Sequence, residues 1–129
     1  MNSSALRRIQ NWPERAHEAG YSVKALAKAY GVSVRVLERL FLLAVGHSPR
    51  HCLKRLRMQR AIELLRDGSN VNETADRLGY RYATHFSAEF KHVYGVPPRV
   101  HARIPQARLA EVLESSHKYM KLSQLYRKS

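Results

Sequence analysis

Two arginines and one glutamate share a face of a predicted helix in the first half of the chain. Arg35, Glu38 and Arg39 lie three and four positions apart, and residues at this spacing are neighbours on a helix surface. An arginine can donate two hydrogen bonds to O6 and N7 of guanine, and a glutamate can accept one from N4 of cytosine. The alternatives are arginine contacts with phosphate and an ion pair between Glu38 and Arg35. This face predicts a contact with the edges of DNA bases.

A second predicted helix carries smaller side chains on its outward face. Its candidate base contacts are Ala83, Thr84, Ser87 and Ala88. The alanines suit a thymine methyl group, and the two hydroxyl groups suit bases or phosphates. The candidate phosphate contacts of the two helices together are Ser33, Arg81, Tyr82 and Lys91. Because the second helix is poor in strong base readers, we expect it to contribute more to affinity and position than to sequence choice.

The overall composition favours a polyanionic partner. The chain has 129 residues, with 23 Lys and Arg against 10 Asp and Glu, and a formal net charge of +13. Its pI of about 10.5 exceeds the value of ~9 that is typical of a nucleic-acid-binding domain. The charge is spread along the chain, and a hydrophobic content of 44% is enough for a folded core. DNA, RNA and an anionic membrane surface all fit this charge.

Several other classes of protein lack support. No apolar run approaches the ~18–20 residues that span a bilayer. Residues 1–10 contain no apolar stretch typical of a secretory signal, and a single cysteine excludes an internal disulfide framework. No nucleophile stands in an activation motif, and no phosphate-binding or dinucleotide loop occurs. His47, His51 and Cys52 lie close together but match no zinc-site spacing. We therefore expect no enzyme activity, cofactor, metal site or membrane partner, and a cytoplasmic, nucleoid-associated location.

The elements that position these side chains are all predicted to be helices, punctuated by glycine. Serine and asparagine stand where helix N-caps are expected, at Ser22, Ser33 and Asn70, and Ser48-Pro49 is a strong start signal. The expected parts are an N-terminal helical segment (1–21), a first helix-turn-helix (22–47), a linker helix (48–68), a second helix-turn-helix (69–103) and a C-terminal amphipathic helix (104–129). The sequence thus predicts an all-α fold.

One pattern occurs twice, on either side of the basic linker helix. Ala27 precedes Gly31 by four positions, and Ala75 precedes Gly79 by four. A small alanine lets two helices cross closely, and a glycine permits the turn between them. This pattern is typical of a helix-turn-helix motif. The alternative interpretation is a plain helical bundle in which the repeat reflects packing alone.

Residues from about Ser22 to Arg103 resemble the DNA-binding domain of the AraC/XylS family of bacterial transcription regulators. The elements that carry the resemblance are Leu26-Ala27, Ser33, Leu37-x-x-Leu40-Phe41, Gly46-x-Ser48-Pro49, Leu56-Arg57-Met58-x-x-Ala61-x-x-Leu64-Leu65, Ala75, Gly79-Tyr80, Phe86-x-x-x-Phe90-Lys91 and Tyr94-Gly95-Val96-x-Pro98. The resemblance implies seven helices, with two recognition helices that enter successive major grooves on one side of the duplex. It also implies recruitment of RNA polymerase, usually for activation.

The sequence departs from the family pattern at two places. Family members often carry basic residues where this chain has the run Leu42–Val45. Leu42 and Leu43 are therefore either an exposed protein-contact patch or packed more tightly against the first helix. Thr74 replaces a branched aliphatic residue, and its hydroxyl group can bond back to the preceding turn. Arg57 falls on a family motif position, and we expect it to be mainly structural.

The length of the linker helix bears on the kind of DNA site. The segment from Pro49 to Asp67 has 19 residues and would be about 28 Å long as a helix. Because successive major-groove segments lie ~34–36 Å apart, one chain can span both of them. We expect a sequence-specific regulator that binds one asymmetric site on double-stranded DNA as a monomer or weak dimer. Two alternatives stay open: a non-specific architectural DNA binder, and a protein-docking module that acts on a larger regulator or on RNA polymerase.

Overall fold

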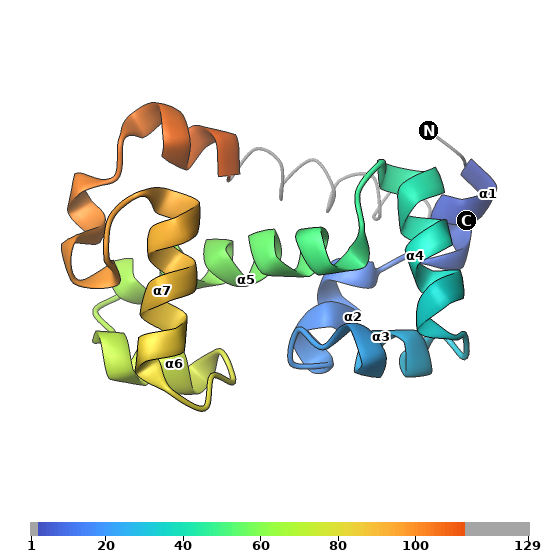
Figure 1. The fold of residues 1–129 in the computed structure, drawn as a ribbon, viewed down its shortest axis with the longest axis horizontal. Coiled ribbons are helices and arrows are strands. Elements are labelled where there is room, and N and C mark those ends of the chain that lie inside the picture. Colours follow the sequence, from blue (N-terminus) through green and yellow to red (C-terminus); the bar gives the residue numbers. More distant parts are fainter. Residues whose placement is uncertain (1–2, 113–129) are drawn as a thin grey trace. The chain divides into compact units, whose positions relative to one another are not determined.

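The computed structural model describes residues 3–112, and this part of the chain is helical without a β-strand (Figure 1). The predicted all-α class is therefore confirmed. The elements are α1 (Ser3–Arg8), α2 (Trp12–Glu18), α3 (Val23–Ala29), α4 (Val34–Val45), α5 (Pro49–Arg66), α6 (Val71–Arg77), α7 (Ala83–Tyr94) and the 3₁₀ helix η1 (Pro98–Arg103). A further helix begins at Gln106. It is the start of the predicted C-terminal helix, whose residues 113–129 lie outside the described residues.

The chain is divided into two compact units, and the boundary between them falls within the sequence of α5. The first unit contains the described residues up to Leu56, and the second begins at Arg57. The first unit therefore holds α1–α4 and the beginning of α5, and the second holds the rest of α5, α6, α7, η1 and the helix that follows.

The core of the first unit is built around α4. Leu37 and Phe41 of α4 are fully buried, and they belong to one cluster with Leu6 and Ile9 of α1. The helices α1 and α4 pack against each other, and the ring centroids of Trp12 and Phe41 lie 5.2 Å apart in an edge-to-face arrangement. The N-terminal helical segment is thus part of the core that supports α4.

The N-terminal helical segment is interrupted between α1 and α2. The helix restarts at Trp12 with Pro13 in its first turn, after Asn11 has taken a left-handed conformation (φ 63°). The hydroxyl group of Tyr30 donates to the carbonyl oxygens of Ile9 and Gln10 at 3.2 and 2.9 Å. The Ile9 oxygen also accepts from the backbone N–H of Trp12, so the Tyr30 hydroxyl group adds a side-chain bond to the carbonyl groups that follow α1.

The predicted N-caps are confirmed. The side chains of Ser22 and Ser33 accept from the backbone N–H of Ala25 and Val36 at 3.1 and 3.2 Å. Ser48 accepts from the N–H of His51 at 3.2 Å. These caps fix the first turns of α3, α4 and α5, because each satisfies one of the N–H groups that a helix start leaves without a partner.

The start of α6 carries a complete capping box. Asn70 accepts from the N–H of Glu73 at 2.8 Å, and the Glu73 carboxylate accepts from the N–H of Asn70 at 3.2 Å. Thr74 is fully buried, and its hydroxyl group donates to the carbonyl oxygen of Asn70 at 2.8 Å. The predicted bond back to the preceding turn is therefore present.

The second unit has an aromatic core on the inner face of α7. Phe86, Phe90 and Tyr94 are fully buried and their rings contact one another in sequence. The hydroxyl group of Tyr94 donates to the carbonyl oxygen of Met58 at 2.9 Å, so α7 is tied to α5 within this unit.

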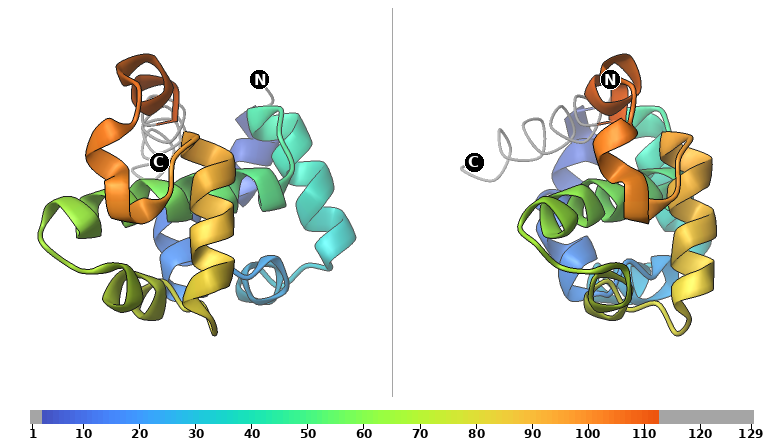
Figure 2. Two further views of the ribbon diagram at one scale, coloured as in Figure 1. Left: turned by 60° about the vertical axis from the view of Figure 1, so that its left-hand side comes forward. Right: turned by 90° about the vertical axis from the view of Figure 1, so that its left-hand side faces the viewer.

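The chain after α7 packs back onto that helix. The 3₁₀ helix η1 contacts α7 (Figure 2). Further on, Arg108 donates from Nε to the carbonyl oxygen of Val93, in the last turn of α7, and both Leu109 and Val112 are buried. The first turns of the C-terminal helix are therefore part of the second unit.

Candidate nucleic-acid interface

The first candidate surface is the outward face of α4. Arg35, Glu38 and Arg39 are exposed, while Leu37 and Phe41 on the opposite face are buried. Within the described residues none of the three charged side chains has a hydrogen bond or ion pair. The alternative ion pair between Glu38 and Arg35 is thus absent there, and the groups that the sequence selected as base readers are available to a ligand.

Ser33 stands at the start of this surface. Its oxygen accepts from Val36, but a hydroxyl group also carries a hydrogen that it can donate. A groove between α3 and the start of α4 is lined by Ser33 together with Lys24 and Lys28. The two lysines are further phosphate-contact candidates that the sequence interpretation omitted, although their spacing of four on a short helix is readable in the sequence.

The second candidate surface is the outward face of α7 and the residues before it. Arg81, Tyr82, Thr84, Ala88 and Lys91 are exposed. Of the other predicted base contacts, Ala83 and Ser87 are half-buried. Tyr82 has 60% of its surface exposed, and the guanidinium carbon of Arg81 lies 5.5 Å from the centre of its ring. Five of the seven predicted residues are therefore exposed to solvent, and Ala83 and Ser87 are less accessible.

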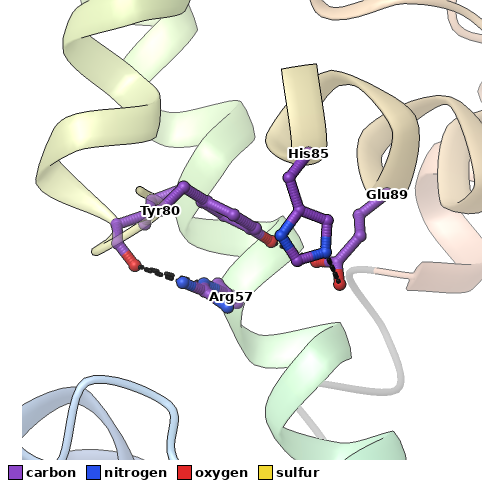
Figure 3. Close-up of polar contacts among 5 residues, drawn as sticks. Arg57, Tyr80, His85 and Glu89 are labelled. Atoms are coloured by element: carbon purple, nitrogen blue, oxygen red, sulfur yellow. Dashed lines mark hydrogen bonds and ion pairs between the residues drawn. The ribbon is translucent and has the colours of Figure 1, made fainter. Parts of the chain in front are cut away.

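The same face presents a residue that the sequence interpretation missed. The side chain of His85 is 64% exposed, and its Nε2 lies 3.3 Å from Oε1 of Glu89 (Figure 3). The other carboxylate oxygen of Glu89 accepts from the hydroxyl group of Tyr80. The spacing of four between His85 and Glu89 is a readable helix-pair signal, whereas the contact with Tyr80 comes from a separate segment.

Arg57 of α5 contacts both Tyr80 and the turn that precedes it. Its Nε and Nη2 donate to the carbonyl oxygen of Leu78 at 3.1 and 2.8 Å, and its guanidinium carbon lies 3.6 Å from the centre of the Tyr80 ring. Arg57 is thus engaged inside the second unit (Figure 3). The prediction that Arg57 is structural is confirmed.

An apolar strip adjoins the first surface. Leu42 is 56% exposed and Leu43 is 46% exposed. The prediction of exposed apolar side chains at these positions is therefore confirmed, and the alternative of tighter packing against the first helix is wrong. Val36, also on α4, is 37% exposed.

The histidines near the start of α5 form a stacked pair. The rings of His47 and His51 lie 4.5 Å apart between centroids. Burial lowers the pKa of His51, and the neighbouring charges of His47, Arg55 and Lys54 lower it further. In residues 3–112 no group of three or more His, Cys, Asp or Glu side chains is arranged to hold a metal ion. None of the described helices is long and apolar enough to cross a membrane.

Each unit contains a short helix, a glycine turn and a second helix whose outer face is exposed. Gly31 and Gly79 take left-handed conformations in these turns, with φ of 69° and 82°, which glycine adopts without steric cost. Two such units define a helix-turn-helix protein. A family model described as a helix-turn-helix domain matches residues 26–104. The chain belongs to the AraC/XylS family of DNA-binding transcription regulators, and the family suggested by the sequence motifs is confirmed.

Curated relatives carry a related domain within longer chains. The chain is 31% identical over 99 residues to the HTH-type transcriptional activator RhaS of Salmonella schwarzengrund, and equally to RhaS of Salmonella arizonae and of Salmonella paratyphi B. Each alignment covers 76% of this chain and 36% of the relative. The chain thus spans about a third of the length of the curated relatives that it matches. No solved structure matches the chain.

Proposed function

We propose that the chain is a sequence-specific activator of transcription that places α4 and α7 in the major groove of double-stranded DNA. The observation that carries this proposal is the exposed face of α4, where Arg35, Glu38 and Arg39 have no partner among the described residues. Ser33 caps the same helix, so the first turns that present these groups are well formed. Activation is favoured because the relatives are transcriptional activators by name.

The continuous α5 supports a site that one chain can read. It has 18 residues without a break and so extends about 27 Å. A contiguous, asymmetric site of about two helical turns, read in successive major grooves, fits an element of that length. Such a site requires only a monomer, or a dimer that forms weakly on DNA.

The two candidate surfaces have different chemistry, and we assign them different roles. Arg35 and Arg39 can each make a two-point contact with guanine, which discriminates between base pairs. The face of α7 offers Thr84 and Ala88 with Arg81 and Lys91 around them, so it contributes mainly phosphate contacts. Phosphate contacts supply affinity that falls steeply with salt.

Selection from a random double-stranded DNA library tests the proposal. The affinity of enriched and non-enriched sequences is then compared at two salt concentrations. A two-part motif spanning about two helical turns, bound at least ~10³-fold more tightly than scrambled DNA, is the expected result. Tight and salt-sensitive binding without enrichment would instead identify an architectural DNA binder.

A second candidate function is favoured by the apolar strip on α4. Leu42 and Leu43 are 56% and 46% exposed, and exposed apolar side chains that lie together suit a protein partner. We propose RNA polymerase as this partner. The double variant Leu42→Ser, Leu43→Ser should bind DNA like the unaltered chain but activate transcription less in a purified system. Unchanged activation would remove the strip from the mechanism.

A further inference from the structure

His85 occupies a position on α7 that nothing in the proposed function uses. It follows Thr84 directly and lies one turn before Ala88, which are both exposed. Its side chain is 64% exposed, and Nε2 lies 3.3 Å from a carboxylate oxygen of Glu89. No described hydrogen bond reaches the other ring nitrogen, Nδ1. His85 is therefore held on one side and open on the other.

Glu89, which holds His85, is itself fixed by a buried tyrosine. Tyr80 is only 7% exposed, and its hydroxyl group donates to the second carboxylate oxygen of Glu89. The guanidinium of Arg57 lies over the face of the Tyr80 ring, and the face of an aromatic ring attracts a cation. The groups around His85 are thus Glu89 on its own helix, Tyr80 in the preceding turn and Arg57 behind Tyr80 (Figure 3).

Glu89 is the one acidic residue of α7, and it poses an electrostatic problem for a DNA-binding helix. A carboxylate close to phosphates repels them, and the interaction is strong where water is excluded. An imidazolium at His85 neutralises this charge. It also carries a proton on each nitrogen, so that Nε2–H faces Glu89 and Nδ1–H is left to donate to another acceptor.

We propose that His85 is a phosphate contact of the second recognition helix, that it binds as an imidazolium held by Glu89, and that DNA binding therefore takes up a proton at this residue. The proposal rests on the proposed function, because it requires α7 to lie against DNA. Histidine changes charge in the physiological pH range. The affinity for DNA should accordingly rise as the pH falls from about 8 to about 6.

The test measures the affinity for a fluorescent duplex of about 30 base pairs, roughly three helical turns, across this pH range at fixed salt. The slope of affinity against pH reports the protons taken up on binding. Between pH 8 and 6, the unaltered chain should gain up to about tenfold more affinity than the His85→Gln variant, which cannot become charged. The matched control is His92→Gln, on the same helix near its other end, and its slope should equal that of the unaltered chain.

A Glu89→Gln variant separates positioning from folding. The amide oxygen can still accept from Tyr80, but no charge holds the imidazolium. This variant should bind at least as tightly as the unaltered chain at pH 8, because a negative charge near the phosphates is gone, and should gain less affinity at pH 6. A purely structural role of Glu89 would weaken binding equally at both pH values and lower the thermal midpoint.

The outcomes distinguish the two proposals. Equal slopes for the unaltered chain and His85→Gln, with DNA binding intact, would overturn the role of His85 and leave the proposed function standing. If the dependence of DNA affinity on pH is reduced in His92→Gln as much as in His85→Gln, the assignment to His85 is overturned. A chain that fails to bind duplex DNA at every pH and at low salt would overturn the proposed function, and the role of His85 with it.

Discussion

Arg57 donates two hydrogen bonds to a single main-chain atom, the carbonyl oxygen of Leu78, at 3.1 and 2.8 Å. Leu78 is the last residue before the turn between α6 and α7, and its carbonyl is among those that a helix end leaves without a partner. A side chain of α5 therefore closes the turn that sets α7 against α6. Arg57 thus supports the turn that leads into α7, with its Nε and Nη2 engaged inside the second unit.

Replacing Arg57 should destabilise the second unit. Arg57→Ala removes hydrogen bonds from a charged donor to a half-enclosed carbonyl, and we expect it to lower the free energy of unfolding by about 2 to 3 kcal/mol. Arg57→Lys should recover only part of this loss, because a single ammonium group cannot reproduce the two-point contact. Urea unfolding measures both. The control is Arg60→Ala, which breaks an exposed pair with Glu63 and should change stability by no more than about 1 kcal/mol. Similar losses for Arg57→Ala and Arg60→Ala would contradict the structural role.

Interactions between residues that are close in sequence could be predicted, whereas interactions that join separate segments of the chain could not. Ser22, Ser33 and Asn70 cap helices through residues three positions away, so a short window of sequence contains the whole interaction. The contact of Arg57 with Leu78 joins residues 21 positions apart, and only the folded chain brings them together. The family motif predicted that Arg57 is structural, but not which atom it binds.

The candidate site could likewise be predicted from the sequence only in part. The outward face of α4 follows from helical periodicity, and the three charged residues predicted there are exposed. On α7 the same reasoning included Ala83 and Ser87, which are half-buried, and omitted His85, which is exposed. Periodicity assigns a residue to a face, but it does not show that His85 contacts both Glu89 and Tyr80.

Thr74 should be replaceable by valine at no cost. Its hydroxyl group donates to the Asn70 carbonyl, but that oxygen also accepts from the backbone N–H of Thr74 at 2.9 Å. Removing the hydroxyl group therefore leaves no buried acceptor unpaired, and Thr74→Val should keep or raise the stability by up to about 1 kcal/mol. Thr74→Ser keeps the hydroxyl group, loses a buried methyl group and should cost about 1 kcal/mol. Chemical denaturation decides: a larger loss for valine than for serine would show that the hydroxyl group carries the stability.

Removing Arg35 or Arg39 should change DNA selectivity without changing stability. Each Arg→Ala variant should lower the affinity for a selected site by about 1 to 3 kcal/mol and relax the preference at one base pair. Binding to scrambled DNA should fall much less. Because both side chains are exposed and have no partner among residues 3–112, the thermal midpoint should not move. Arg66→Ala, at the exposed end of α5, removes the same charge outside the proposed interface and serves as the control. If the variants lose equal affinity for selected and scrambled DNA, these arginines contact phosphates and not bases.

Alkaline pH should weaken the first unit through its buried cysteine. Cys52 is fully buried in the core cluster that includes Phe41, and burial raises the pKa of its thiol from 9.0 to about 12. Above pH 9 the unfolded chain releases the thiol proton while the folded chain retains it, so the free energy of unfolding must fall as the pH rises from 9 toward 12. Cys52→Val has no thiol to titrate, and by pH 10.5 its stability should have fallen less than that of the unaltered chain by about 2 kcal/mol. Urea unfolding at pH 8 and pH 10.5 measures this difference. Burial also raises the pKa of Tyr30, so the free energy of unfolding of Tyr30→Phe should also fall less steeply with pH in this range. If the free energy of unfolding falls equally with pH for the unaltered chain and both variants, neither group couples alkaline pH to folding.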